Sequence, residues 1–445
     1  MFHKFSKKVF RRLEEMAKIL SFFRTIRNNW KKSLVACAAV TYGISYGKEV
    51  YDANQLMRQY CESVSQYGDF PLPTNIKPRH VTIILNPTAK KGKAKKLFQN
   101  YCEPLLHLAG IAVTVIQTDS QNDARKIIMD LDTPTDAIIV AGGDGTLSDV
   151  LTGLVRKYDH NLDSVKQCPI GILPLGQTNK IAKSLYHEYD DLSDIKQVIE
   201  ATMAIIHEKS KMMDMIEVKP IDNNPEEPAK PIYAMGTVEW GVWKDANASA
   251  NKYWYWGFLR KYVTYVFNGY EENLNKYCDA VLKYTLPCEG CSRCSQNNLI
   301  SNLNTRWWHI FLPRYNASRD SIDFSKRINE KCDVLHELPI STCELHVATS
   351  NIDKLQVESS PPSLKVKIGP KDINYFSFVS EGWKKEKSNK SLCNQVVEAK
   401  KIELTPQKTD KNHTLYIDNE EYELKAVEIK LLSQAVKVFC SQLNS

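Results

Sequence analysis

The sequence predicts a two-domain α/β protein, with an N-terminal three-layer α/β domain and a C-terminal, mostly antiparallel β domain. Three observations support this. Short apolar runs alternate with helix-like segments from residue 80 to 207, β-rich pieces dominate after residue 211, and 445 residues exceed what one small core needs. A hydrophobic content of 43% and a charged content of 25% are ordinary for a folded protein, which excludes disorder along the whole chain.

Residues 1–47 predict a targeting and membrane-associated segment. The first 32 residues carry ten Lys or Arg against two acids, interleaved with aromatic and aliphatic side chains. This is typical of a mitochondrial targeting helix and also suits an anionic membrane surface. Residues 33–47 carry no charge, but a spanning helix needs about twenty apolar residues. A buried globular helix and a cleaved leader remain alternatives. Residues 48–75 predict a polar linker that ends at prolines.

Residues 76–208 predict the α/β domain, because short apolar runs alternate with helical spacing. Parallel pairing and right-handed crossovers follow from that alternation, and ligands of such sheets bind beyond the carboxyl ends of the strands. The expected strands are 81–85, 111–118, 136–142 and 169–176, and the expected helices are 92–110, 122–131, 147–155, 178–187 and 194–207.

Residues 209–445 predict the β-rich domain, with a polar, irregular insertion near 285–335. Helix signals are sparse here. The β-rich pieces lie at 211–219, 231–240, 341–350, 363–369, 374–380, 413–424 and 426–432.

The chain has 12 cysteines, well below the density of a disulfide scaffold. Cys288, Cys291 and Cys294 follow one another at three-residue spacing, with Cys278 upstream. CxxC spacing lets two sulfurs reach one tetrahedral zinc ion, although the two CxxC pairs overlap and cannot both close independently. A loop with free thiols is the alternative.

A glycine-rich turn follows the third expected strand. Gly142, Gly143 and Gly145 flank Asp144, and a helix begins near Thr146. Glycines tolerate positive φ and let phosphate oxygens approach the backbone, while the helix N-terminus adds a partial positive charge. Asp144 is a candidate general base or Mg²⁺ ligand. The alternative is a plain glycine turn with Asp144 as a helix cap.

Phosphate-compatible residues also follow the other expected strands, which favours a phosphate site over a plain turn. A net charge of +7 suits an acidic ligand or membrane, whereas nucleic acid is disfavoured because the basic residues concentrate at the N-terminus. The phosphate-compatible residues are Asn86, Pro87 and Gly92 with Lys90, Lys91 and Lys93, then Thr118, then Gly176, Thr178 and Asn179, and near the C-terminus Asp418, Glu420 and Glu421.

Together, "ILNPTAKKGKA", "VAGGDGTLSDVLTGL", "GILPLGQTN" and "IDNEEYEL" resemble the catalytic fold of diacylglycerol kinases, shared with sphingosine and ceramide kinases. "LFQNYCEPLLHLAGIAVTVIQTD" and "KYWYWGFLRK" resemble the acylglycerol kinases of mitochondria within that family. The resemblance covers roughly residues 20–285 and 340–440. It implies the two-domain lipid-kinase fold.

The resemblance also implies roles for individual residues. Asp144 and Glu420 would be catalytic, and Asp144, Asp418 and Glu420 would bind Mg²⁺, with the choice of base between Asp144 and Glu420 left open. Asp245 would face the lipid head group, with a surface loop acid as the alternative. Lys180 and Asn419 depart from the family pattern, which has an acid and a glycine there. ATP would contact Asn86, Pro87, Thr118, Gly142, Gly143, Gly145, Thr146, Gly176, Thr178 and Asn179.

The resulting hypothesis is an ATP- and Mg²⁺-dependent kinase that phosphorylates monoacylglycerol and diacylglycerol to lysophosphatidic and phosphatidic acid. The resemblance implies a place at the mitochondrial inner membrane, facing the intermembrane space. Three alternatives remain: a structural subunit of an inner-membrane protein-import (carrier translocase) complex, a NAD kinase that shares the GGDGT motif, and a sphingosine or ceramide kinase.

Overall fold

A computed structural model of the protein describes residues 28–69, 77–120, 122–187, 189, 192–221, 230–270, 277–288, 290–295, 328–352, 361–388, 393–407 and 413–441. The chain forms two compact units, Met1–Gln66 and Tyr67–Ser445. The basic segment before residue 28 and most of the predicted insertion lie outside the described residues, so those predictions stay open.

Helix α2 (Trp30–Gly68) includes the predicted uncharged segment and continues to Gly68, so much of the predicted linker is helical. Leu34, Val40 and Ile44 are exposed, which contradicts the alternative of a buried globular helix. Among the described residues, no helix combines the length and the apolar character needed to cross a membrane.

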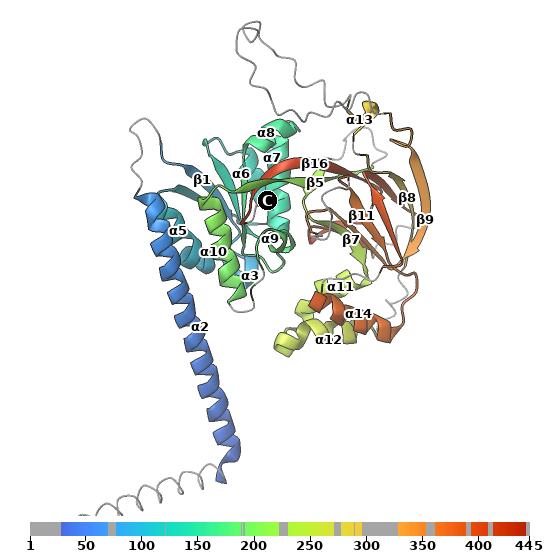
Figure 1. Ribbon diagram of the computed structural model, residues 1–445. Coiled ribbons are helices and arrows are strands. Elements are labelled where there is room, and N and C mark those ends of the chain that lie inside the picture. Colours follow the sequence, from blue (N-terminus) through green and yellow to red (C-terminus); the bar gives the residue numbers. More distant parts are fainter. Residues whose placement is uncertain are drawn as a thin grey trace, which may run out of the picture. The chain divides into compact units, whose positions relative to one another are not determined.

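The parallel sheet confirms the predicted α/β domain. Its order is β2-β1-β3-β4, and helix α7 packs on β3 while α10 packs on β4. Helices α6 and α8 contact α7, and α5 contacts α10, which gives the two helical layers (Figure 1). The strands are β1 (His80–Leu85), β2 (Ala112–Gln117), β3 (Ala137–Gly142) and β4 (Ile170–Pro174). The helices are α3 (Ala89–Gly92), α4 (Ala94–Leu97), the π-helix η1 (Phe98–Cys102), α5 (Glu103–Leu108), α6 (Asp123–Met129), α7 (Asp144–Lys157), α8 (Leu162–Gln167), α9 (Lys180–Leu185) and α10 (Ser193–Ile206).

The helix predicted over 92–110 is confirmed from Ala94 to Leu108, where α4, η1 and α5 follow one another directly, and Gly110 with a φ of 72° comes after it. The departure is the π-helical turn inside this helix, while Lys90 and Lys91, with left-handed φ values of 50° and 59°, lie before it. A wider π turn keeps Phe98 and Cys102 both buried while the chain continues into α5.

The C-terminal part consists of two sheets that share one apolar core, which confirms the predicted β-rich domain. β16 pairs with β4 through Val438 and Ile170, so the first of these sheets and the parallel strands β1–β4 form one ten-stranded sheet. The first sheet contains β5 (Ser210–Pro220), β6 (Ile232–Ala234), β8 (Cys278–Thr285), β9 (Leu335–Thr342), β13 (Lys401–Pro406) and β16 (Val427–Phe439). The second contains β7 (Thr237–Gly241), β10 (Glu344–Ala348), β11 (Leu364–Ile368), β12 (Gln395–Ala399), β14 (Thr414–Ile417) and β15 (Glu420–Glu423).

A group of helices interrupts the β domain: α11 (Val242–Ala248), the 3-10 helix η2 (Ser249–Leu259), α12 (Arg260–Asn268) and α14 (Tyr375–Ser388). The strand predicted at 374–380 is therefore wrong. Phe378 is buried, its ring stacks on that of Trp243, and a side chain on Gly382 would collide with Tyr265. Phe378 and Gly382, four positions apart, both lie against Tyr265, and this helical packing overrides the local alternation of aromatic residues.

Candidate functional site

The carboxyl ends of β1, β3 and β4 bring together three of the predicted loops. The Nδ2 of Asn86 donates a hydrogen bond to the Oγ1 of Thr146 at 3.2 Å. The backbone N–H of Asp144 donates to the carbonyl of Thr178 at 3.4 Å. Asn179 fixes its own loop, because its Oδ1 accepts from the N–H of Gly176 at 3.0 Å. The loops after three separate strands therefore form one contiguous surface.

The glycines of this surface are required for close approach, and the predicted use of positive φ is wrong. None of Gly142, Gly143, Gly145 or Gly176 has a left-handed φ. A Cβ on Gly176 would lie 2.3 Å from the Cα of Gly143, so a side chain would push the two loops apart. Gly143 instead precedes α7 in an extended conformation. Because Gly143 has no Cβ, the N-terminus of the helix stays accessible at this position.

Asp144 is the first residue of α7 and is buried, with 5% of its surface exposed. Its Oδ2 accepts from the N–H of Lys180 at 3.0 Å and its Oδ1 from the N–H of Ile181 at 3.4 Å. Burial and the nearby negative charge of Asp418 raise the pKa of Asp144 to about 7, against the opposing effect of these donors. Each carboxylate oxygen keeps one lone-pair position beyond these bonds.

Asp418 and Asn419 form the two-residue turn between β14 and β15, with left-handed φ values of 45° and 70°. A type I′ hairpin needs φ > 0 at both positions, so Asn replaces glycine here as the sequence predicts. The carboxylate of Asp418 accepts four contacts from the N–H groups of Met235, Gly236 and Thr237, at 2.7 to 3.3 Å. Three N–H groups thus hold this carboxylate, and that of Gly236 is shared between its two oxygens.

The same turn places Glu420 and Asn419 against the nucleotide-side loops. The Oε1 of Glu420 lies 2.1 Å from the position that a Cβ on Gly145 would take, so a side chain there would displace the Glu420 carboxylate. The Nδ2 of Asn419 donates to the Oγ1 of Thr178, and its Oδ1 accepts from the Nζ of Lys244. The two catalytic candidates, Asp144 and Glu420, thus flank the N-terminus of α7.

A buried charge network beside Asp144 was missed by sequence reasoning. Glu239 on β7 pairs with the Nζ of Lys180, and its Oε2 lies 3.6 Å from the Nζ of Lys244. Burial raises the pKa of Glu239, but the lysines outweigh it and hold that pKa well below its usual range. Burial lowers the pKa of His346, also beside Glu239, to about 4, so His346 is neutral near pH 7. An acid inside the apolar run "MGTVEWG" was the available signal.

This network gives Lys180 a partner within the protein. Its amine is committed to Glu239 and Thr237, while its N–H binds Asp144. Lys180 therefore holds α9 against β7 and Asp144 at once.

Other predicted residues belong to elements or loops other than α7. Thr118 is buried after β2, one strand beyond β1, and its N–H donates to the carbonyl of Leu85 at 2.9 Å. Pro87 continues the loop of Asn86. Asp245 lies on α11, and its Oδ1 accepts from the hydroxyl of Tyr416 on β14 at 3.0 Å.

The chain is similar to known lipid kinases along most of its length. Residues 80–218 match the diacylglycerol kinase catalytic domain, and residues 235–444 match the acylglycerol kinase C-terminal family. The mitochondrial acylglycerol kinases of Mus musculus and Homo sapiens are each 32% identical to it, over 94% of this chain and 96% of the relative. Sphingosine kinase 1 of Rattus norvegicus is 29% identical over 44% of this chain and 50% of the relative.

Proposed function

The chain belongs to the acylglycerol kinase family, and we propose that its site around Asp144 transfers the γ-phosphate of ATP to the free hydroxyl of monoacylglycerol and diacylglycerol. The products are lysophosphatidic acid and phosphatidic acid. The observation that carries the assignment of the site is Asp144, a buried carboxylate whose pKa is raised to about 7 at the N-terminus of a helix. NAD, sphingosine and ceramide kinases are not favoured, because the similarity to acylglycerol kinases covers both halves of the chain.

ATP binds along the joined strand-end loops in this proposal. The N–H groups at the start of α7 and the helix dipole favour phosphate oxygens, and the glycines keep Cβ atoms away from them. Lys91, in left-handed backbone after β1, adds positive charge, whereas the Nζ of Lys90 pairs with Asp194 at 2.7 Å. We assign nucleotide contacts to Asn86, Pro87, Thr118, Gly142, Gly143, Gly145, Thr146, Gly176, Thr178 and Asn179.

The oxygen donors beside the glycine turn fit Mg²⁺, which prefers carboxylate ligands together with substrate phosphates. Asp144 keeps lone pairs, and the Glu420 carboxylate lies against Gly145 next to it. When bound, Mg²⁺ neutralises phosphate charge. We assign Glu420 to it, because Asp144 serves as the base, and we give Asp418 a positioning role because three backbone N–H groups hold its carboxylate.

Asp144 acts as the general base. Its carboxylate takes the proton of the lipid hydroxyl, the hydroxyl oxygen bonds to the γ-phosphorus, and ADP leaves with the electrons of the broken P–O bond. A base is most effective when its pKa lies near the working pH, and the raised pKa of Asp144 meets that condition. The N–H groups of Lys180 and Ile181 fix the carboxylate during the transfer.

The helical group of the β domain supplies the membrane contact. Tyr253 is buried, but the exposed fractions are 73% for Trp254, 62% for Tyr255 and 87% for Phe258. Exposed aromatic side chains of this kind prefer the membrane interface. Asp245 lies on α11, just before this run, where it would face a lipid head group.

The protein is mitochondrial, as its relatives are named. We place it at the inner membrane, facing the intermembrane space, with α2 and the aromatic run as its contacts with an anionic surface. Association with protein-import subunits is a separate hypothesis, for which rescue of carrier import by Asp144→Asn is the test.

The test of the function is transfer of radiolabelled phosphate from ATP by the full chain, in vesicles that contain monoacylglycerol, diacylglycerol, ceramide or sphingosine, with NAD in solution. We expect label in the two acylglycerols, and none with Asp144→Asn. Label in NAD or in the sphingolipids alone would overturn the proposal.

Membrane docking has its own test. The double variant Trp254→Ala, Phe258→Ala should bind anionic vesicles about tenfold more weakly in a sedimentation assay. Full burial of the two side chains would contribute about 4 kcal/mol, and the substitutions remove part of that contribution. Val396→Ala, at an exposed apolar position of β12, is the matched control and should bind normally. Equal binding by both variants would contradict the aromatic contact.

A further inference from the structure

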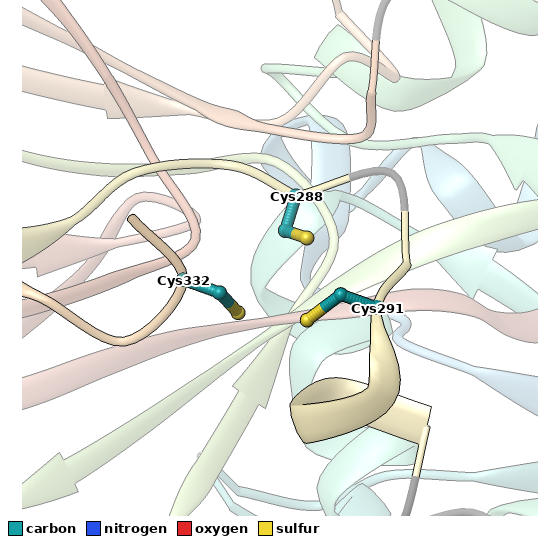
Figure 2. Close-up of side chains that lie close together, drawn as sticks. All are labelled: Cys288, Cys291 and Cys332. Carbon is teal, nitrogen blue, oxygen red and sulfur yellow. The ribbon is translucent and has the colours of Figure 1, made fainter. Parts of the chain in front are cut away.

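Three cysteine sulfurs converge outside the kinase site. The Sγ atoms of Cys288, Cys291 and Cys332 all lie within 4.8 Å of one another. Figure 2 shows the three side chains pointing toward a common centre from two separate segments of the chain. Cys291 and Cys332 are buried and Cys288 is half-buried. None of the three is in a disulfide.

The cluster lies where the segment between β8 and β9 leaves the sheet and returns to it. Thr285 and Leu335 are the last paired residues of these antiparallel strands. Cys288 follows β8 by three residues and Cys332 precedes β9 by three. Cys278, which the sequence suggested as a further ligand, pairs with Thr342 at the opposite end of β8 and is excluded.

The backbone between Cys288 and Cys291 favours the geometry of two zinc ligands. Cys288 and Cys291 have the CxxC spacing with which two sulfurs reach one zinc ion. Gly290 between them has a φ of 124°, which a residue with a side chain rarely adopts, so glycine is required for this turn. In a tetrahedral site with zinc–sulfur bonds of about 2.3 Å, the sulfurs lie roughly 3.8 Å apart, so the three thiols need to close by only about 1 Å.

The surroundings favour thiolates. The Nδ2 of Asn329 donates to the Sγ of Cys288 at 3.3 Å, and its Oδ1 accepts from the N–H of Lys331, which fixes the amide orientation. Second-shell donors of this kind orient and stabilise sulfur ligands. Arg293 donates to the carbonyl of Cys332, and Lys331 is adjacent in sequence, so positive charge offsets that of several thiolates.

We propose that Cys288, Cys291 and Cys332 bind one zinc ion, which closes the base of the segment that joins β8 to β9. Zinc is the metal for a buried set of soft thiolate ligands in a structural site. Cys294, three residues after Cys291, is the residue that the sequence offers for the fourth position. Closing a segment of this length restricts the unfolded chain, so the metal stabilises the β domain without entering the kinase reaction.

The proposal is tested by zinc content. The full chain is purified under reducing conditions without chelator, and its zinc content is measured by elemental mass spectrometry. We expect about one zinc per chain in the wild type, and at least a fivefold loss in Cys288→Ser and Cys332→Ser. Cys393→Ser changes another half-buried cysteine outside the cluster and should keep its zinc.

A second measurement, on the wild type, tests the proposal even if the cysteine variants fail to fold. A mercurial thiol reagent added to the folded wild type should release the zinc to a colorimetric indicator, in step with thiol modification. Absence of zinc from the wild type, equal zinc in all variants, or a disulfide between two of the three cysteines in non-reducing peptide mapping would each overturn the proposal. Metal content is read without kinase activity, so this result is independent of the proposed function.

Discussion

The turn after β3 and the turn between β14 and β15 each hold a buried aspartate, but the two carboxylates have different surroundings. Asp144 accepts one N–H on each oxygen, whereas Asp418 accepts four contacts from three consecutive N–H groups. Burial raises the pKa of both. Burial alone therefore does not identify a catalytic acid or base. The lone pairs that the backbone leaves available distinguish the two.

The largest expected effect is loss of catalysis in Asp144→Asn. An amide cannot take the hydroxyl proton, so kcat should fall by about 10³-fold, within the range typical of general bases. Steady-state phosphorylation of diacylglycerol is the measurement. The thermal midpoint should also fall, because the new amide nitrogen leaves one of the N–H groups of Lys180 and Ile181 without an acceptor at a cost of about 1–3 kcal/mol, so kcat is expressed per folded molecule. Asp163→Asn makes the same chemical change at an exposed side chain of α8 and should keep full activity. Full activity of Asp144→Asn would show that this comparison of the two turns is wrong.

The pH dependence of the rate sharpens the role of Asp144. Only the ionised carboxylate accepts a proton, so kcat/KM should fall about tenfold per pH unit below a midpoint near 7 and level off above it. The negative charge of Asp418 is the second cause of the raised pKa. The midpoint should therefore move to lower pH in Asp418→Asn. A flat profile from pH 5 to 8 would exclude Asp144 as the base.

The same pKa affects stability with a definite sign. Asp144 binds its proton more tightly folded, with a pKa of about 7, than unfolded, where the ordinary value is 3.8. The folded state therefore holds more protons between these values, and the contribution of Asp144 to stability falls as the pH rises through that window. Relative to wild type, Asp144→Asn should gain stability from pH 5 to pH 8 in urea titrations. A constant difference would contradict the raised pKa.

Asp418→Asn should act mainly on folding. The new amide nitrogen faces backbone N–H groups that Asp418 now satisfies, and buried donors left without a partner cost about 1–3 kcal/mol. Urea unfolding should show this loss, while kcat per folded molecule stays within tenfold of wild type. A thousandfold loss of kcat in well-folded Asp418→Asn would give the two aspartates the same role.

The strands and the strand-end loops could be predicted because apolar runs and loop residues are local features. Asn86, Thr146, Thr178 and Asn179 meet as expected. The roles of Gly176 and Asp418 could not be predicted, because the Cα that excludes a side chain at Gly176 and the N–H groups that hold Asp418 come from distant segments. The same holds for Cys332, which lies 41 residues beyond Cys291 in sequence.

The smallest expected effect concerns Asn419, where two substitutions distinguish the contribution of the left-handed backbone from that of the side chain. Its φ of 70° suits glycine, so Asn419→Gly should keep stability within about 1 kcal/mol, whereas Asn419→Ala should lose about 1–2 kcal/mol to left-handed strain. Both variants lose the bonds to Thr178 and Lys244. The KM for ATP should therefore rise a few-fold in both, with kcat nearly unchanged, because those bonds tie the hairpin turn to the nucleotide loop. If the KM rises only in the alanine variant, backbone strain and not the side-chain bridge couples this turn to the site.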